Sequence, residues 1–212
     1  NCRAVLALFS TIKDNTAEKT VYGELNSLLQ NVTDRMYIAP ELSVDTVEYR
    51  RTQQILQEKA IAVQYTQAGT TFSLGGAEIE VWTPPSAADG LNNHSLVLRV
   101  VYGDTAFLLM GDAEREEEEA LLASGMPLRA DVLKVGHHGS DTSTGKALLD
   151  AVQPRYAAIS TAWDSSRLPR ETVLRRLRSA GVALYRTDVC GTLLFLSDGE
   201  TVRVVTENEA CA

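Results

Sequence analysis

The chain is poor in the residues that build metal centres and membrane spans. Its 212 residues include three histidines and three cysteines, and no two cysteines have the CxxC spacing typical of a thiolate zinc site. No window approaches the roughly 18 consecutive apolar residues of a membrane span, and the apolar run Ala4–Phe9 is too short for a signal peptide. The sequence therefore predicts no membrane segment in this chain.

Positive charge is also scarce. The formal net charge is -8, which argues against a broad nucleic-acid-binding surface, because duplex binding depends on Lys and Arg that neutralise phosphates. A small local positive site is still compatible with this charge. Much of the acidity lies in one run, Glu114–Glu119, which we interpret as a solvated helix face near the positive end of a helix dipole.

The three cysteines, Cys2, Cys190 and Cys211, leave two alternatives open. Chain ends often lie close together in compact domains, so a Cys2–Cys211 disulfide is one expectation in an oxidising compartment. Unpaired thiols are equally compatible with the sequence.

Apolar strands alternate with amphipathic helices along the whole chain without a linker-like stretch, which predicts one α/β domain over residues 1–212. Strands are expected at Ala4–Phe9, Met36–Ala39, Ile61–Thr66, Ala77–Thr83, Ser95–Tyr102, Thr105–Met110, Val132–Val135, Tyr156–Ser160, Ala183–Arg186, Thr192–Ser197 and Thr201–Val205. Helices are expected at Ala17–Gln30, Asp45–Lys59, Ala113–Ser124, Thr144–Val152 and Pro169–Ala180.

Turn residues predict two hairpins, one at Tyr102–Asp104 and one at Ser197–Glu200. Hairpins mixed with crossover helices favour sheets covered by helices over a purely parallel sheet. No Gly-rich dinucleotide or phosphate-binding loop follows a strand, so the sequence does not support a nucleotide cofactor.

The densest polar cluster, KVGHHGSDTS at Lys134–Ser143, stands directly after a buried strand and before a helix. Side chains at strand ends project from a rigid edge into a crevice, and hydroxyls at a helix N-terminus can cradle an oxyanion. The competing interpretation is structural: Ser140–Thr144 cap the helix, and the histidines bond to loop backbone. Both stay open on these residues alone.

A second candidate is Asp112, which also follows a buried strand. Its carboxylate is well placed to bind a cation, but Asp is equally suited to cap the helix that follows.

Several blocks, in order and at characteristic spacing, resemble the metallo-β-lactamase-fold domain of ComEC-type competence proteins and their small secreted relatives. The resemblance runs from Leu91 to Gly199. Its blocks are Asn92–Leu98, Tyr102–Gly103, Phe107–Glu114, Ala130–Ser140, Tyr185–Asp188 and Cys190–Thr192. The fold that this implies is an αββα sandwich.

The resemblance implies a phosphodiester hydrolase with two metal ions, which would lower the pKa of a bound water. Asp112 matches the bridging ligand of that family, and His137 and His138 match its HHGS block. The resemblance thus assigns Asp112, His137 and His138 to catalysis, and Asp14, Asp112 and His137 to metal binding. Lys134, Ser140 and Arg186 are expected to contact substrate.

Most of the imidazoles that the family carries are missing. In the HxHxDH segment, Ser10, Ile12 and Asn15 stand at the histidine positions and only Asp14 is kept. Leu168 replaces the histidine of a later GHP block. We therefore expect either no metal or one weakly bound Mn, Mg or Zn ion. His94 is interpreted as an exposed turn residue, with metal ligation as the alternative.

The family fold opens with strands that precede the HxHxDH segment, and this sequence starts only a few residues before Ser10. We expect a second chain or a homodimer to complete the sheet, because an open apolar edge invites pairing. Relatives act outside the cytoplasmic membrane, which favours an extracytoplasmic location, although a cytoplasmic one is compatible with the sequence.

Two functions follow. The leading hypothesis is a catalytically degenerate domain that binds single-stranded nucleic acid or a phosphorylated ligand. The alternative is a metal-dependent phosphodiester hydrolase that uses the reduced site.

Overall fold

The computed structural model describes residues 5–7, 36–41, 45–66, 69–82, 92–162, 167–208 and 211. Its strands are β1 (Val5–Ala7), β2 (Met36–Ala39), β3 (Ala62–Tyr65), β4 (Thr70–Leu74), β5 (Ala77–Trp82), β6 (Val97–Tyr102), β7 (Thr105–Leu109), β8 (Val132–Lys134), β9 (Tyr156–Ile159), β10 (Ala183–Arg186), β11 (Leu193–Ser197) and β12 (Val202–Thr206). The α-helices are α2 (Val47–Glu58), α3 (Arg115–Ala123), α4 (Lys146–Val152), α5 (Glu171–Ser179) and α6 (Thr187–Cys190), and the 3-10 turns are η1 (Asn92–His94) and η2 (Gly136–Gly139).

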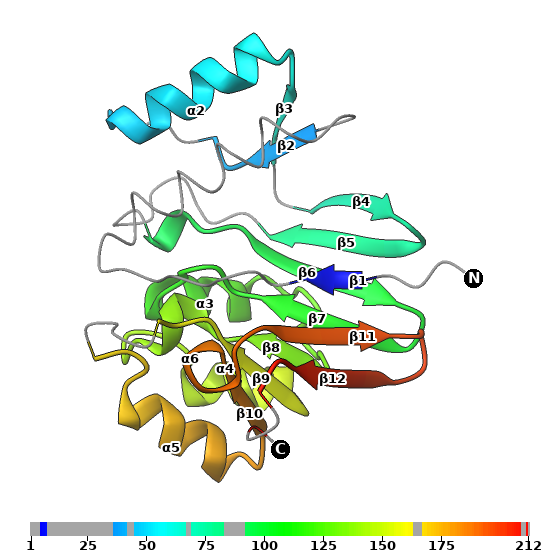
Figure 1. Cartoon of the computed structure of the whole chain (residues 1–212), viewed down its shortest axis with the longest axis vertical. Helices are drawn as coiled ribbons and strands as arrows, with labels where there is room; N and C mark the ends of the chain where they lie inside the picture. The colour runs from blue at the N-terminus through cyan, green and yellow to red at the C-terminus, as the bar shows by residue number, and fades with distance from the viewer. Residues whose placement is uncertain are drawn as a thin grey trace.

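The largest sheet has seven strands in the order β10-β9-β8-β7-β6-β5-β4. Strands β7 to β10 run parallel and are joined by helices, whereas β4 to β7 are antiparallel. A three-stranded antiparallel sheet, β1-β11-β12, lies in front of the large sheet in Figure 1. The expected mixture of hairpins and crossovers is therefore confirmed.

Two apolar layers hold the large sheet between helices and the second sheet. On one face, Leu108 and Leu133 pack with Leu121, Leu149 and Leu177 from α3, α4 and α5. On the other face, residues of the large sheet pack with residues of α6, β11 and β12: Phe107, Val132, Ala158, Cys190, Leu193, Phe195 and Val202. This layering agrees with the predicted metallo-β-lactamase-like α/β fold.

Helix α5 shows how the local sequence selects the buried face. Val173, Leu174 and Leu177 recur at helical spacing and are all buried, while Arg175 and Arg178 fall on the solvent side. A 3.6-residue period places these three apolar side chains on one stripe.

Helix α2 with β2 and β3 lies at the far end of the molecule, beyond β4 (Figure 1). Ile55 and Leu56 of α2 pack against Tyr37, Ile61 and Val63, which makes a separate small core over the parallel β2–β3 pair. None of the helices among the described residues combines the length and hydropathy needed to cross a bilayer.

Both predicted hairpins are confirmed, since β6 pairs with β7 and β11 pairs with β12. Strand β4 was not predicted because Thr70–Leu74 is short, polar and mostly exposed, and it forms only by pairing with β5. The helix expected at Ala17–Gln30 lies outside the described residues.

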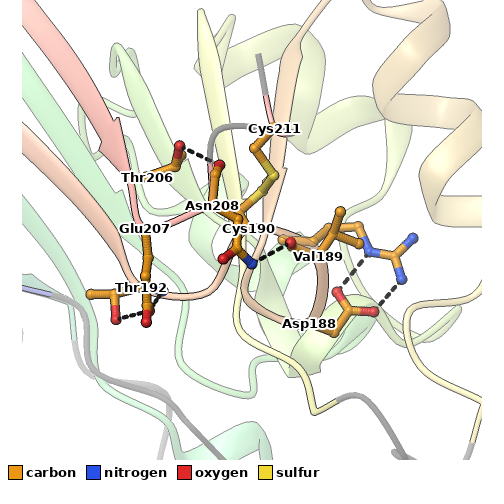
Figure 2. Close-up of a disulfide and its surroundings, with 9 residues drawn as sticks. Asp188, Val189, Cys190, Thr192, Thr206, Glu207, Asn208 and Cys211 are labelled. Carbon is orange, nitrogen blue, oxygen red and sulfur yellow. Dashed lines mark hydrogen bonds and ion pairs between the residues drawn. A yellow bond between two sulfur atoms is a disulfide. The ribbon is translucent and has the colours of Figure 1, made fainter.

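The expected Cys2–Cys211 disulfide is wrong, because Cys211 is bonded to Cys190. Figure 2 shows how the end of the chain returns to α6: the Asn208 amide donates to the Cys190 carbonyl at 3.0 Å, and the Asn208 side chain donates to Val189 O at 2.9 Å. The Glu207 carboxylate accepts hydrogen bonds from the backbone and hydroxyl of Thr192. These contacts bring Cys211 over the buried Cys190.

Candidate functional site at the strand ends

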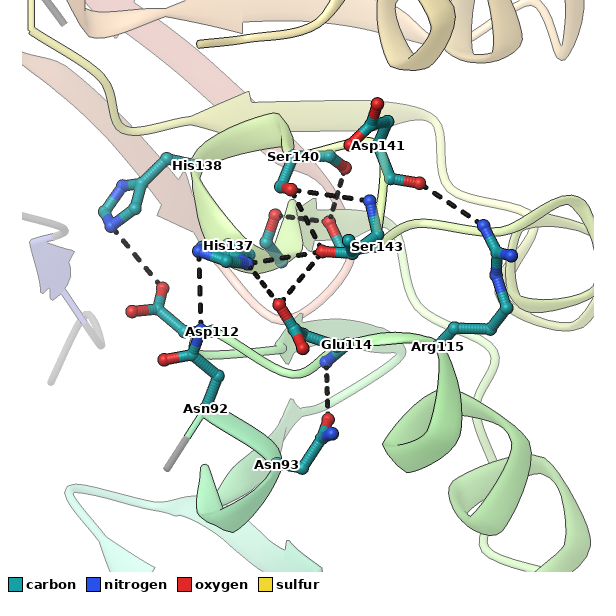
Figure 3. Close-up of polar contacts among 12 residues, drawn as sticks. Asn92, Asn93, Asp112, Glu114, Arg115, His137, His138, Ser140, Asp141 and Ser143 are labelled. Atoms are coloured by element: carbon teal, nitrogen blue, oxygen red, sulfur yellow. Dashed lines mark hydrogen bonds and ion pairs between the residues drawn. The ribbon is translucent and has the colours of Figure 1, made fainter. Parts of the chain in front are cut away.

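Loops that follow three neighbouring parallel strands converge at one edge of the large sheet. Asp112 follows β7, the His137–His138 pair follows β8, and Ser160 follows β9. This is the edge at which open α/β sheets hold their ligands. The chain thus brings together residues that are far apart in sequence, and Figure 3 shows His138 facing Asp112 and His137 facing Glu114 and Asn92.

The two histidines stand in an unusual backbone turn. Their φ angles are 44° at His137 and 52° at His138, a left-handed conformation that non-glycine residues rarely adopt and that stores strain. The turn is held by the His137 amide, which donates to Gly111 O at 3.1 Å, and by the Ser143 hydroxyl, which donates to Gly136 O at 2.8 Å. The strain is therefore imposed by the surrounding loop.

His138 pairs with Asp112. Its Nδ1 lies 2.7 Å from the Ser160 carbonyl oxygen, which can only accept, so the proton of a neutral imidazole is on Nδ1. Its Nε2 then presents a lone pair to Asp112 Oδ1 at 3.4 Å. Two acceptors that face each other need a shared proton or a cation to be stable.

His137 pairs with Glu114. Its Nδ1 lies 3.0 Å from Glu114 Oε1 and 3.4 Å from the Thr142 hydroxyl, and its Nε2 lies 3.5 Å from the side-chain amide nitrogen of Asn92. Asp112 therefore has His138 as its imidazole partner, and His137 is held by the start of α3.

Asp112 does not cap α3, and that interpretation is wrong. The helix begins at Arg115 with Glu114 as N-cap. The Asp112 amide donates to the Ser95 hydroxyl at 3.1 Å, so the residue is tied to the turn before β6. Its carboxylate is left facing His138.

The alternative that Ser140–Thr144 cap α4 is also wrong. The N-cap of α4 is Gly145, and the backbone amides of Thr144 and Gly145 donate to the carboxylate of Glu118 on α3. An anion from the protein itself therefore occupies this helix N-terminus.

The interpretation of Glu114–Glu119 as a solvated face is wrong for two of its members. Glu117 and Glu118 are only 2% and 3% exposed, because helix geometry turns them toward the same interior as Leu121. Burial raises the pKa of Glu117 to about 8, helped by the charge of Glu118. Burial also raises the pKa of Glu118, against the hydrogen bonds from Gly145 and Thr144.

The three residues expected to bind substrate lie near this edge but are already engaged. The half-buried Lys134 donates from Nζ to Val135 O at 2.8 Å, and burial lowers its pKa to about 8 while the charge of Asp112 opposes the shift. The Ser140 hydroxyl contacts that of Thr142 at 2.9 Å. Arg186 makes a bidentate ion pair with Asp188, with Nε 3.0 Å from Oδ1.

Other predicted positions divide into two groups. Asp14, Ser10, Ile12 and Asn15 lie outside the described residues. Leu168 lies beside the histidine turn, since its neighbour Pro169 packs on Gly139 and the Arg170 amide donates to Gly139 O at 2.9 Å. His94 ends η1 and is half-buried rather than exposed.

Sequence reasoning missed three polar residues of this site: Asn92, Asn93 and Glu114. Asn93 is buried, accepts from the Glu114 amide at 3.1 Å and donates to Glu116 at 3.3 Å. The adjacent asparagines before a strand were a usable signal, because buried amides bridge loops that lack a regular backbone partner.

The described residues contain no group of three or more His, Cys, Asp and Glu side chains placed to hold one metal ion. Asp112 and His138 nevertheless fit a shared cation. Two ligands at about 2.0–2.2 Å from one tetrahedral ion lie about 3.4 Å apart, which matches the separation of Asp112 Oδ1 and His138 Nε2.

Comparison with known proteins defines the class of this chain. The family model of the metallo-beta-lactamase superfamily matches residues 35–163, more than half of the chain. The chain therefore belongs to the metallo-β-lactamase superfamily.

Its relatives within that superfamily include competence proteins. The chain is 31% identical over 182 residues to ComE operon protein 3 of Bacillus subtilis (strain 168), covering 84% of this chain and 23% of that protein. It is 43% identical over 106 residues to competence protein ComA of Neisseria gonorrhoeae, covering 49% of this chain and 15% of that protein. These matches confirm the resemblance to ComEC-type proteins, of whose length the chain spans less than a quarter.

Among solved structures, the metallo-beta-lactamase fold protein YhfI from Bacillus subtilis aligns with a TM-score of 0.47 and 7% identity. The alignment covers 79% of this chain and 69% of that chain.

Proposed function

We propose that this chain is a catalytically degenerate ComEC-like domain that binds a single-stranded nucleic acid or another phosphorylated ligand at the strand-end loops. The observation that carries the proposal is the shortage of metal ligands. The whole chain has three histidines, and two of its three cysteines form a disulfide. Tightly bound zinc sites draw mainly on imidazole and thiolate ligands, so this small supply argues against a pair of tightly held zinc ions.

One divalent cation fits better than two. Asp112 and His138 would supply two donors, and water would complete the shell, as Mg²⁺ and Mn²⁺ accept. Adjacent ligands of an octahedral ion lie about 3.0 Å apart, so the two side chains would move slightly closer to bind one of these ions. When bound, the ion would supply positive charge at the sheet edge. We expect the protein to bind this cation weakly, because Asp112 and His138 supply two of its ligands and water supplies the others.

Charge at the site makes ligand binding depend on that cation. The carboxylates of Asp112 and Glu114 both face the loops (Figure 3), and they repel a phosphate at short range. Lys134 offsets part of this charge, whereas Arg186 is neutralised by Asp188. We therefore expect phosphodiester binding to be weak and to rise when Mn²⁺ is added.

The test compares metal content and DNA binding in one preparation. The chain is purified without chelator, its metal content is measured, and a fluorescent single-stranded DNA is titrated with and without Mn²⁺. Asp112→Ala should lose the Mn²⁺-dependent binding. Asp104→Ala, which removes an exposed carboxylate from the β6–β7 turn, should keep it.

Two results would overturn the proposal. Stoichiometric Zn or Mn together with Asp112-dependent cleavage of a phosphodiester would make the chain a hydrolase. Absence of DNA and phosphate binding at all Mn²⁺ concentrations would remove the binding role.

We also propose an extracytoplasmic location. The Cys190–Cys211 disulfide supports it, because disulfides persist in oxidising compartments and are rare in the cytosol. Alkylation of free thiols in protein taken directly from cells tests this: mass spectrometry should find Cys190 and Cys211 unmodified, and labelling of both would contradict the proposal.

A further inference from the structure

Glu114 stands between the histidine turn and the asparagine turn. Its Oε1 lies 3.0 Å from His137 Nδ1 and accepts a hydrogen bond from the Thr142 hydroxyl at 3.0 Å. Its backbone amide donates to Asn93 Oδ1 at 3.1 Å. The carboxylate is therefore fixed from both sides, although it belongs to the acidic run that the sequence placed in solvent.

The neighbours of His137 all select the same tautomer. A carboxylate oxygen only accepts, so Glu114 requires the proton on Nδ1. The Thr142 hydroxyl gives its proton to Glu114 and can only accept from Nδ1. On the other side of the ring, the Asn92 amide nitrogen only donates, so it requires a lone pair on Nε2.

We propose that Glu114 is a positioning residue that locks His137 as the Nδ1–H tautomer and keeps Nε2 as a bare acceptor for a ligand. The ligand class is a hydrogen-bond donor, since the cation of the proposed function is placed on Asp112 and His138. Carboxylate partners of this kind fix the ring orientation of metal-binding histidines. The assignment of a ligand rests on the proposed function, but the tautomer does not.

A ligand would bind His137 Nε2 by replacing the side-chain amide nitrogen of Asn92. At 3.5 Å the Asn92 contact is long for a hydrogen bond, so a stronger hydrogen-bond donor can replace it at little cost. Glu114 contacts the opposite edge of the ring and stays in place during that exchange.

The experiment measures the His137 tautomer by nitrogen-15 NMR on the full chain, without metal or DNA, at about pH 8, above the range in which histidines usually charge. The wild type should show Nδ1–H at His137. Glu114→Ala should shift the population toward Nε2–H. Glu114→Gln should keep Nδ1–H, because the amide oxygen still accepts from Nδ1.

Glu119→Gln is the matched control, since Glu119 is an exposed member of the same run and should leave the His137 signals unchanged. Backbone amide spectra identify any variant that fails to fold. Glu114→Leu, which removes the acceptor but keeps an extended side chain, then carries the test with the same expected shift toward Nε2–H.

An Nε2–H tautomer in the wild type, or an unchanged tautomer in folded Glu114→Ala, would overturn the positioning role. A confirmed tautomer without any binding of DNA or Mn²⁺ would instead overturn the proposed function and leave the positioning role standing. The two failures are thus distinguishable.

Discussion

Glu118 on α3 accepts a hydrogen bond from the backbone amide of Gly145 at 2.8 Å, and so holds the start of α4 from a different helix. The amide of Thr144 donates to the same carboxylate, and Arg176 on α5 donates to the Thr144 carbonyl. Three helices therefore meet at the end of the histidine loop, which ties the site to the core.

Removal of this carboxylate should destabilise the protein. Glu118→Ala leaves the buried amide of Thr144 and the half-buried amide of Gly145 without this acceptor, at a cost of about 1–3 kcal/mol for the buried group. Urea unfolding should show the loss, whereas Glu119→Ala should change stability by less than about 0.5 kcal/mol. Equal stability of the two variants would show that the Glu118 contact contributes little.

Glu117 should make stability fall as pH rises. Its pKa is about 8 in the folded protein against the ordinary value of 4.5, so the folded state holds the proton that the unfolded state loses. Between about pH 4.5 and pH 8 the free energy of unfolding should therefore decrease, by at most about 1.4 kcal/mol per pH unit from this group. Below that window the group has no effect.

Glu117→Met should remove this dependence, because a buried apolar side chain has no charge to desolvate. The variant should be more stable than the wild type at pH 8 and nearly equal at pH 4.5, as measured by urea unfolding at both values. A stability difference that does not vary with pH would contradict burial of an ionisable Glu117.

Gly139 should tolerate no side chain. Its φ is 82°, and an added Cβ would lie 2.5 Å from Pro169 Cβ. Gly139→Ala should therefore cost more than Gly125→Ala, whose φ of 76° brings the same strain but whose Cβ would meet open space. We expect about 1 kcal/mol at Gly125 and about 2–4 kcal/mol at Gly139. Thermal unfolding of the two variants gives the comparison.

The disulfide should stabilise the end of the chain. It closes a loop with a sequence separation of 21 residues, for which chain entropy gives about 3 kcal/mol. Reductant should lower the unfolding midpoint of the wild type and leave that of a Cys190→Ala/Cys211→Ala double variant unchanged. Detection of a peptide linking Cys2 to Cys211 in the native protein would contradict the assigned pair.

Sequence periodicity and turn residues predicted most of the strands and helices of the described fold. The parallel strands β8 and β9 follow from short apolar runs between helices, and the β6–β7 hairpin follows from Gly103. Strand β4 was missed because its exposed Thr71 and Ser73 carry no apolar pattern, and the strand forms by pairing with β5.

The sequence predicted where the site lies, but it did not predict which side chains contact one another there. Asp112, His137 and His138 became candidates because they follow buried strands, and the resemblance to ComEC-type proteins assigned them to the site. The partners of the two imidazoles, Glu114 and Ser160, were not identified, because local sequence carries no information on which distant side chain faces which ring nitrogen.

The pattern of charged residues was a poor predictor of solvent exposure. Glu117 and Glu118 lie in a run of acidic residues that predicts solvent exposure, yet both are buried. Cys190 and Cys211 likewise carry no spacing signal, and their bond depends on the chain end returning along Thr192 and Val189.

The sequence by itself determined the order of strands and helices, the resemblance to the superfamily and the small number of histidines, because these depend on residue type and local order. Only the tertiary structure decided that His138 faces Asp112, that Glu114 holds His137, and that Glu118 occupies the start of α4. Those relationships depend on how the helices pack over the central sheet, which brings together side chains that no local pattern connects.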